Sequence, residues 1–243
     1  MRPRLTVVGW AGFYKGKMAK IVHQIFYDFY GSGMNQLFQD SAKRFRAWAE
    51  GNGYEYMLWS EEDCGKLMEE YADYADMYTF ARYPIMQVDI ARLCILHKMG
   101  GLYADLDVFP QLDKMKFCDF ALAVDKTSKG QKKKGAVTNE IMQSSKGGPV
   151  LIGFLDYIKS QIKEKENISV YKERKARFVL HTTGPYALHR FLKLNNINCE
   201  RYTTNQLEFG KAWKYKGLGN THGVDFICHH SLSWYECLNQ KPL

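Results

Sequence analysis

The strongest constraint on the fold is a helical segment that stops at two adjacent glycines and passes directly into an apolar strand. Pro84 suits a first helical turn, and apolar side chains recur every three or four positions over residues 85–96. Gly100 and Gly101 are suited to end this helix, and side-chain character alternates over the residues 102–109 that follow. The sequence therefore predicts a helix followed at once by a strand over 102–109.

The same alternation of strand and helix patterns extends upstream. Residues 20–26 and 54–59 are rich in β-branched and aromatic side chains, as strands are. Between them, residues 35–50 have helical spacing and end at a Gly-Asn-Gly sequence, and Ser60 with three following acids predicts the start of another helix. Strands that alternate with helices favour an α/β sheet with mostly parallel strands, in which ligands bind beyond the strand carboxyl ends.

The downstream half has weaker patterns. Residues 117–124 are strand-like, and residues 150–164 and 185–194 have helical spacing. Residues 164–177 form a charged connection or a helix end, and residues 224–230 predict a strand that delivers histidines to its end. We expect these segments to belong to the same α/β domain.

Length and hydropathy predict one soluble domain over residues 1–243. A single α/β domain often reaches this size, and the 46% hydrophobic and 25% charged shares are those of globular proteins. No stretch approaches the roughly 20 apolar residues that a membrane span needs. Residues 1–17 contain a short apolar run followed at once by lysines, which predicts a tail or a first edge strand and no signal peptide. A cytoplasmic location is the expectation, and the compartment otherwise stays open.

The formal net charge of +8 predicts an anionic partner. Nucleic acid, a phosphorylated donor and a membrane face would all be attracted by this charge. Much of the excess is local, because five lysines crowd a Gly- and Ser-containing stretch over residues 126–135. This composition predicts a mobile basic loop, and we expect no nucleic acid to be bound.

Two acids, Asp105 and Asp107, lie towards the end of the predicted strand. Carboxylates two positions apart on a strand point to the same face, where they repel each other unless a cation or hydrogen-bond donors intervene. Hard oxygen ligands suit Mn²⁺ or Mg²⁺, which keep open positions for phosphate oxygens. In sugar transfer from a nucleotide diphosphate, such a cation neutralises charge on the leaving group. A bare acidic pair is also common at solvated strand ends, so the neighbouring residues must decide between a metal site and a solvated strand end.

Two other classes of function compete for this motif. A Mg²⁺-dependent phosphatase uses a strand-end D-x-D as nucleophile and acid, but it expects Thr or Val where this chain has Phe109 and normally places the motif after the first strand. A non-catalytic basic module that binds nucleic acid or an anionic membrane would account for the net charge. That module leaves the two carboxylates without a role.

The residues around the acidic pair match a known signature. The run 86–108 contains an Asp-x-x-Arg helix with Asp89 and Arg92, the Gly-Gly turn, the aromatic Tyr103 and then D-x-D. It resembles the D-x-D sugar transferases of glycosyltransferase family 32, which include yeast initiating mannosyltransferases and are similar to the glucosylating domains of large clostridial toxins. The resemblance implies a GT-A-like fold, with a central, mostly parallel sheet flanked by helices.

The resemblance covers nearly the whole chain from Lys20 to Trp234. Further matches are the opening strand at 20–26, the second strand at 54–59, an asparagine-containing helix start at 138–142, a T-G-P turn at 183–185 and the ending at 229–234. Phe26 stands where the family usually has Trp, and Leu232 stands where Gly is more usual. These departures put the shape of the C-terminal loop in doubt.

The resemblance implies a metal-dependent transferase that moves a hexose to an acceptor hydroxyl with retention of anomeric configuration. The implied donor is a UDP-hexose or GDP-mannose, the implied cofactor is Mn²⁺ or Mg²⁺, and the acceptor can be a glycan, a protein or a lipid. The catalytic residues would be Asp89, Arg92, Asp105 and Asn139; the nucleotide-sugar-binding residues His23, Gln24, Trp59, Asp89, Arg92, Tyr103, Asp105, Ser233 and Trp234; the metal ligands Asp105, Asp107 and His230.

Several of these residues also have simple structural explanations. Asp107 is the implied direct ligand, whereas Asp105 would contact ribose or sugar hydroxyls and metal-bound water. Asp89 and Arg92 lie three apart on one helix face and could pair with each other. Trp59 could stack on the base or belong to the core, and His230 could be a ligand or a structural histidine.

Overall fold

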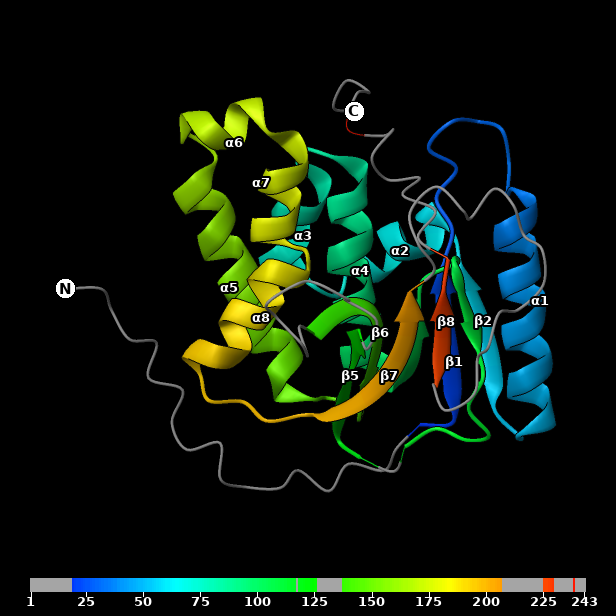
Figure 1. Ribbon diagram of the computed structural model, residues 1–243. Helices are drawn as coiled ribbons and strands as arrows, with labels where there is room; N and C mark the ends of the chain where they lie inside the picture. Colours follow the sequence, from blue (N-terminus) through cyan, green and yellow to red (C-terminus); the bar gives the residue numbers. More distant parts are fainter. Residues whose placement is uncertain (1–18, 117, 126–136, 207–224, 230–237, 239–243) are drawn as a thin grey trace.

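The computed structural model describes residues 19–116, 118–125, 137–206, 225–229 and 238 (Figure 1). In this part of the chain, eight strands form one sheet in the order β2-β1-β3-β6-β5-β7-β8-β4. The strands are β1 (Ile21–Ile25), β2 (Glu55–Trp59), β3 (Gly101–Ala104), β4 (Val108–Pro110), β5 (Phe120–Asp125), β6 (Val137–Ser144), β7 (Glu200–Gln206) and β8 (Phe226–Cys228). The predicted tail at 1–17 and the basic loop at 126–135 lie outside the described residues.

Most neighbouring strands in the sheet are parallel. The pairs β1 with β2, β1 with β3, β5 with β7 and β7 with β8 are parallel, whereas β6 is antiparallel to both β3 and β5, and β4 is antiparallel to β8. Parallel strands β1 and β3 lie side by side, so their carboxyl ends open on the same edge of the sheet. The predicted α/β class with a mostly parallel sheet is confirmed.

Helices flank the sheet on both sides (Figure 1). They are α1 (Gln36–Gly51), α2 (Glu61–Met68), α3 (Ala72–Thr79), α4 (Pro84–Met99), α5 (Pro149–Lys165), α6 (Ser169–Glu173), α7 (Lys175–Thr182) and α8 (Pro185–Leu194). Two signals used to predict helix ends are present: Ser60 forms a capping box with Asp63, and Gly100 with φ 71° ends α4. In addition, the Asn35 side chain caps α1. Among the described residues, no helix combines the length and the apolar character that crossing a bilayer requires.

Helix α4 is the centre of the core. Eleven consecutive residues, from Met86 to Leu96, are buried in it, and the helix packs against α2, α3, α5, β1, β3 and β6. A helix covered on all sides is expected to be apolar throughout. The side chains of Asp89 and Arg92 are therefore exceptional, since charges are buried at a considerable desolvation cost unless they are paired.

The acidic motif does not lie within a strand, contrary to prediction. The predicted strand over 102–109 divides into β3 and β4, and residues 105–107 form a turn between them. The Val108 N–H donates to the carbonyl of Asp105 over 3.2 Å, which closes the turn. The inference that both carboxylates project from one strand face is thus wrong, because the chain changes direction between them.

The segment 138–142 was expected to begin a helix, and this prediction is also wrong. These residues belong to β6, where Ile141 pairs with Ala104 and Met142 pairs with Tyr103. The segment contains β-branched residues that suit a pleated strand. In this strand, Asn139 is brought beside the end of β3.

Candidate active site

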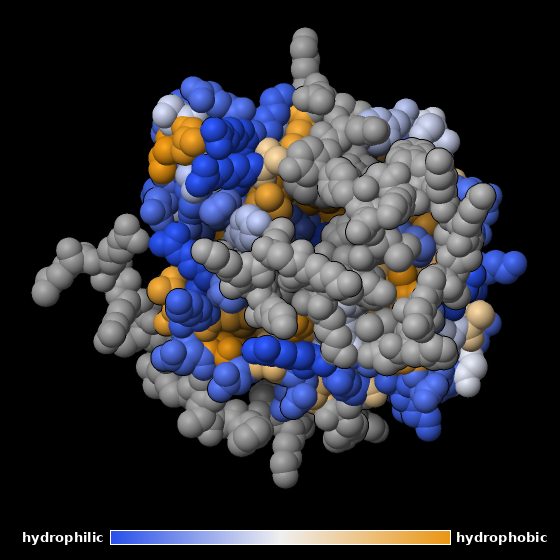
Figure 2. All heavy atoms as spheres, viewed as in Figure 1, coloured by the Kyte–Doolittle hydropathy of each residue, from blue (hydrophilic) through white to orange (hydrophobic). Residues whose placement is uncertain are grey.

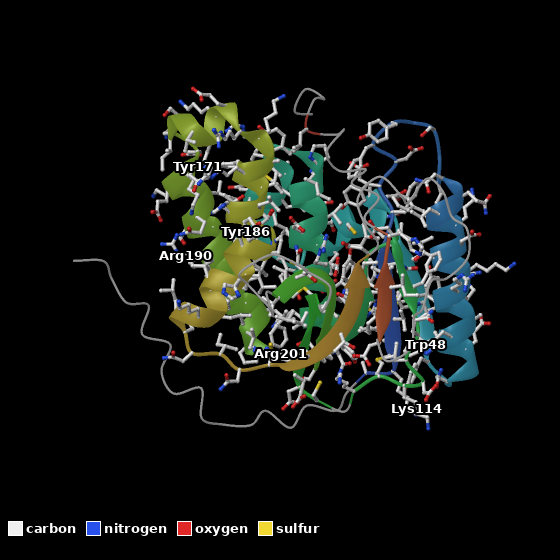
Figure 3. The ribbon with its side chains drawn as sticks, viewed as in Figure 1. Trp48, Lys114, Tyr171, Tyr186, Arg190 and Arg201 are labelled. Atoms are coloured by element: carbon white, nitrogen blue, oxygen red, sulfur yellow. The ribbon has the colours of Figure 1, made fainter. Side chains whose placement is uncertain are left out.

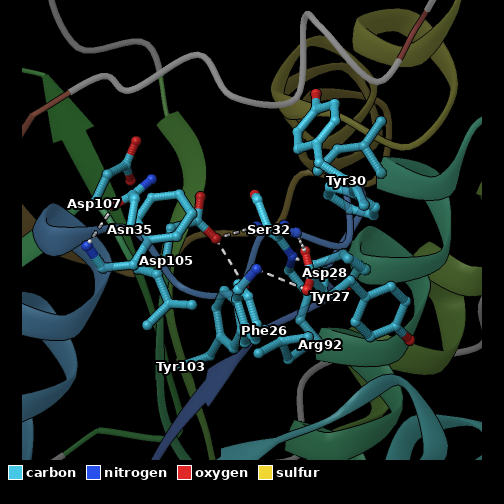
Figure 4. Close-up of a pocket in the computed structure, with 17 residues that line it drawn as sticks. Phe26, Tyr27, Asp28, Tyr30, Ser32, Asn35, Arg92, Tyr103, Asp105 and Asp107 are labelled. Atoms are coloured by element: carbon cyan, nitrogen blue, oxygen red, sulfur yellow. Dashed lines mark hydrogen bonds and ion pairs between the residues drawn. The ribbon is translucent and has the colours of Figure 1, made fainter. Parts of the chain in front are cut away.

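The candidate site lies at the carboxyl ends of β1 and β3, against the first turns of α4 (Figure 4). Its walls come from the chain that follows β1, from α4 and from the turn after β3. The lining residues of the described chain are Ile25–Tyr30, Ser32, Gly33, Asn35, Phe38, Ile85, Val88, Arg92, Tyr103 and Asp105–Asp107. This cavity of about 150 Å³ is smaller than a typical ligand pocket, so it can enclose only part of a ligand as large as a nucleotide sugar.

Arg92 is a buried cation at the floor of the pocket. Its guanidinium lies 3.1 Å from Asp89 and 3.1 Å from Asp105, and it donates to the carbonyl of Asn139 over 2.7 Å. The Cζ atom of this guanidinium lies over the ring of Tyr103, 4.7 Å from the ring centroid. Burial by itself lowers the pKa of Arg92, but the carboxylates, Asp105 foremost, outweigh it and raise that pKa above its ordinary value. Arg92 therefore stays positively charged, and its guanidinium is held in one orientation.

Asp89 is held by three residues from three elements. Besides its ion pair with Arg92, one carboxylate oxygen accepts from Asn139 Nδ2 over 2.9 Å, and the other accepts from the Thr183 hydroxyl over 2.6 Å. Burial raises the pKa of Asp89, while Arg92 and these donors act in the opposite direction. The pairing of Asp89 with Arg92 that the sequence allowed is present, and Asn139 and Thr183 join the same network.

Asp105 connects this network to the pocket. Its Oδ1 accepts from the Tyr103 hydroxyl over 2.7 Å and faces Arg92, while 31% of the side chain stays exposed. Loss of hydration raises the pKa of Asp105 to about 7, against the lowering effect of Arg92. A carboxyl that is costly to ionise in this way is stabilised by a further positive charge in the pocket.

Asp107 follows at the outer end of the turn, and Figure 4 shows it beside Asn35 and Asp105. Its carbonyl accepts from the His229 N–H over 2.8 Å, which ties the turn to the end of β8. His229 itself is buried, and its ring lies 4.3 Å from that of Phe109. The predicted ligand His230 and the predicted donor-binding residues Ser233 and Trp234 lie outside the described residues.

Three of the predicted donor-binding residues, His23, Gln24 and Trp59, lie in β1 and β2, below the pocket. His23 contacts the carbonyl of Gly100 over 2.9 Å and accepts from Trp59 Nε1 over 3.2 Å. Burial lowers the pKa of His23 to about 4, so the ring is neutral. Gln24 donates to the Asp105 carbonyl over 3.2 Å. All three side chains are buried, and the structure does not bring them to the pocket wall.

Sequence analysis missed the aromatic side chains that follow β1. Phe26, Tyr27, Tyr30 and Phe38 line the pocket, and the Tyr27 hydroxyl is fixed by a 2.5 Å hydrogen bond to Tyr78. The signal was available, because this segment follows a strand that was predicted to be parallel, and ligands bind at such ends. The missed Thr183 gave a weaker signal, since its partner Asp89 lies 94 residues away.

Comparison with known proteins identifies part of the chain. Residues 36–122 match a family described as "Glycosyltransferase sugar-binding region containing DXD motif". This region runs from α1 into β5 and includes Asp89, Arg92, Asp105 and Asp107. The predicted resemblance to D-x-D sugar transferases is confirmed.

Two curated relatives come from Schizosaccharomyces pombe. "Inositol phosphoceramide mannosyltransferase 3" is 31% identical over 100 residues, which are 41% of this chain and 27% of that protein. "Inositol phosphoceramide mannosyltransferase 1" is 28% identical over 94 residues, which are 38% of this chain and 28% of that protein. The chain thus matches little more than a quarter of the length of either relative.

A solved structure supports the fold. The protein named "PaToxG Glycosyltransferase" superposes with a TM-score of 0.50 at 17% identity, over 76% of this chain and 74% of that chain. At this identity the likeness concerns the fold alone. The predicted GT-A-like architecture is confirmed.

Proposed function

We propose, on the premise that residues 36–122 carry a DXD-containing sugar-binding region of glycosyltransferases, that this chain moves a hexose from a nucleotide-diphosphate sugar to an acceptor hydroxyl. The observation that carries the proposal is the buried Asp89–Arg92–Asp105 network at the end of β3, which faces a pocket with aromatic walls. An ion network this costly to bury is expected where a ligand needs fixed, oriented charge.

A divalent cation fits the residues at the turn. The carboxylates of Asp105 and Asp107 are hard oxygen donors that suit Mn²⁺ or Mg²⁺. The described residues contain no group of three or more side chains placed to hold a metal ion, so donor phosphates and water would complete its coordination. When bound, the cation supplies positive charge to the departing diphosphate.

The chain's own residues orient the donor. Arg92 presents a permanent positive charge towards the phosphates, and Asp89, anchored by Asn139 and Thr183, keeps that guanidinium in place. In transfer with retention, the bond between the sugar carbon and the diphosphate breaks, and the diphosphate keeps the electron pair. The acceptor oxygen bonds to the same face of that carbon, and its proton passes to a departing phosphate oxygen. Asp105 lies beside these groups and orients the sugar hydroxyls.

The aromatic wall suits the nucleoside. Phe26, just after β1, and Tyr30 line the pocket and keep part of their rings exposed, and base stacking on such rings contributes about 1–3 kcal/mol per base in other binding proteins. Since the cavity is small, the base and ribose would fill it, while the hexose would lie over Asp105 and Asp107. The proposed role of Trp59 as the stacking residue is less well supported, because its indole is buried in the core.

GDP-mannose is the first donor to test, since both curated relatives are mannosyltransferases by name. Their acceptor, inositol phosphoceramide, suggests a hydroxyl on a phosphate-bearing polyol as the acceptor of this chain. The UDP-hexoses complete the panel.

The decisive experiment measures slow donor hydrolysis. The chain is incubated with each nucleotide sugar and Mn²⁺ or Mg²⁺, and the released nucleotide and sugar are quantified with and without excess chelator. Asp107→Asn should lower the rate at least about 100-fold, the scale on which loss of charge stabilisation reduces catalysis. Asp113→Asn makes the same chemical change at an exposed position outside the pocket and should leave the rate unchanged.

Two outcomes would overturn the proposal. One is hydrolysis that continues at the full rate in excess chelator, and the other is an Asp107→Asn rate equal to that of the unmodified chain. Release of phosphate from a simple phosphate monoester, without any action on nucleotide sugars, would favour the phosphatase alternative.

A further inference from the structure

A second hollow is lined by residues of the α7–α8 region and shares no lining residue with the candidate active site. It is an open groove of about 460 Å³, within the size range of small-ligand sites. Its lining residues are Arg174, Ala176, Arg177, Leu180, His181 and Tyr186. Figure 3 labels Tyr186, with Tyr171 and Arg190 near it on the same group of helices.

The groove is basic and contains no acid in its wall. Arg174, at the N-cap of α7, and Arg177, inside α7, are both exposed, and both line the groove. Among the described residues, neither guanidinium has a carboxylate within salt-bridge distance. Figure 2 shows strongly hydrophilic residues gathered over this group of helices. Guanidinium groups without carboxylate partners are suited to bind a phosphate group, to which each can donate two hydrogen bonds.

The rest of the groove is aromatic and apolar. The ring of His181 lies 5.2 Å from that of Tyr186 in an edge-on arrangement and 5.9 Å from that of Tyr171. Tyr186 is 52% exposed although Tyr rings usually bury most of their surface, and Ala176 and Leu180 supply apolar surface between the charged groups. An exposed ring beside cations suits a ligand that has both an apolar ring face and an anionic group.

The groove is connected to the active-site network by the turn between its two helices. Thr183 stands two residues after His181 and three before Tyr186, and its hydroxyl donates to Asp89 over 2.6 Å. Movement of this turn would be transmitted to Asp89. The groove residues are thus linked, through this turn, to the groups proposed to orient the donor.

We propose that the α7–α8 groove binds a phosphorylated sugar or polyol, with the phosphate on Arg174 and Arg177 and the ring against Tyr186. This binding does not rest on the proposed transferase function. The same chemistry can come from a lipid headgroup or from a soluble sugar phosphate. Nucleic acid is disfavoured, because two arginines three positions apart give too short a track for a phosphate backbone.

Binding is measured directly by calorimetry on the full chain without any donor, with inositol phosphate as the probe. The double variant Arg174→Ala/Arg177→Ala should lower the affinity at least about tenfold, since two charge-assisted contacts are lost. The matched control, Lys172→Ala/Lys193→Ala, removes two exposed positive charges from α6 and α8 outside the groove wall and should change the affinity less than about twofold. Tyr186→Ala should weaken inositol phosphate binding and leave inorganic phosphate binding unchanged.

A flotation assay separates the two sources of the ligand. Binding to vesicles that contain phosphatidylinositol, but not to phosphatidylcholine vesicles, indicates a lipid headgroup, and binding only to the free phosphate indicates a soluble one; both outcomes support the groove. Equal binding by the double variant and the control, or tighter binding of a short DNA oligonucleotide than of inositol phosphate, would overturn the proposal. Donor hydrolysis without acceptor should be the same in all these variants, so a failure here is distinguishable from a failure of the proposed function.

Discussion

The donor pocket and the α7–α8 groove both present arginine to a ligand, but they hold it in opposite ways. Arg92 is 3% exposed and is fixed by two carboxylates and a carbonyl, whereas Arg174 and Arg177 are exposed and have no carboxylate partner in the described chain. A buried cation of this kind contributes to the stability of the fold as well as to ligand binding, because the neighbouring carboxylates can stay ionised in the core only while the cation is present. Substitutions in the pocket should therefore change stability and function together, and substitutions in the groove should change binding alone.

The largest expected effect tests this contrast directly. Arg92→Leu leaves Asp89 and Asp105 buried without their cation, which should cost about 3–5 kcal/mol of unfolding free energy. Arg174→Leu should change it by less than about 0.5 kcal/mol, because the side chain is exposed. Denaturant unfolding measures the free energy of unfolding of both variants. Equal losses would show that the arginine in the pocket contributes no more to stability than the arginine in the groove.

The Arg92→Leu effect should also depend on pH. Without the cation, burial raises the pKa of both carboxyls further, so the folded state binds protons that the unfolded state has already released. The loss of stability should thus be smaller at pH 5 than at pH 8. A loss that is independent of pH would mean that packing, and not charge, explains the effect.

The second prediction concerns His23, which is buried below the pocket, in contrast to the exposed His189 on α8. The folded pKa of His23 is about 4, below the ordinary value of 6.5, so the unfolded chain takes up a proton first as the pH falls. Stability should therefore decrease as the pH falls from about 6.5 to about 4, by up to about 3 kcal/mol, and this slope should end below pH 4.

Replacement of the histidine isolates that contribution. His23→Gln should flatten the stability profile between pH 6.5 and 4, whatever it costs at neutral pH. Thermal unfolding at several pH values measures the slopes. An unaltered slope in His23→Gln would show that other groups produce the acid sensitivity.

The two regions also differ in how far the sequence predicted them. Helix α4, its Gly100 end and the strand after it were found because each carries a local signal: a helical period, a cap or a β-branched run. The break in the strand at Asp105 was not found, because the turn is also held by residues distant in sequence: the Asp105 N–H donates to the Glu140 carbonyl in β6, and the Asp107 carbonyl accepts from the His229 N–H after β8. Likewise, Arg174 and Arg177 of the groove lie in the segment 164–177, which was predicted only as a charged connection or a helix end.

In the candidate site too, residues with a local sequence signal could be picked out from the sequence, whereas the placement of others, which depends on distant residues, could not. Asp89, Arg92, Asp105 and Asp107 lie in one continuous match to a known signature, and the structure brings them to one pocket or its floor. Asn139 was predicted on the wrong element, yet β6 still delivers it to Asp89. Burial of Trp59 depends on how β1 pairs with β2 and on the helices behind them, which no local pattern contains.

The smallest expected effect concerns Thr183, where the pocket and the groove meet. Thr183→Val keeps the shape of the side chain and removes the hydroxyl that donates to Asp89, which should cost about 1.5–3 kcal/mol, as expected for a hydrogen bond to a charged group. Thr183→Ser keeps the donor and should restore most of that stability. Donor hydrolysis should fall in the Val variant and recover in the Ser variant, because Asp89 positions Arg92, whereas inositol phosphate binding should be the same in both. If Thr183→Val weakened the binding of inositol phosphate as strongly as it slowed hydrolysis, the turn would be part of the groove itself, and the two regions would have to be treated as one site.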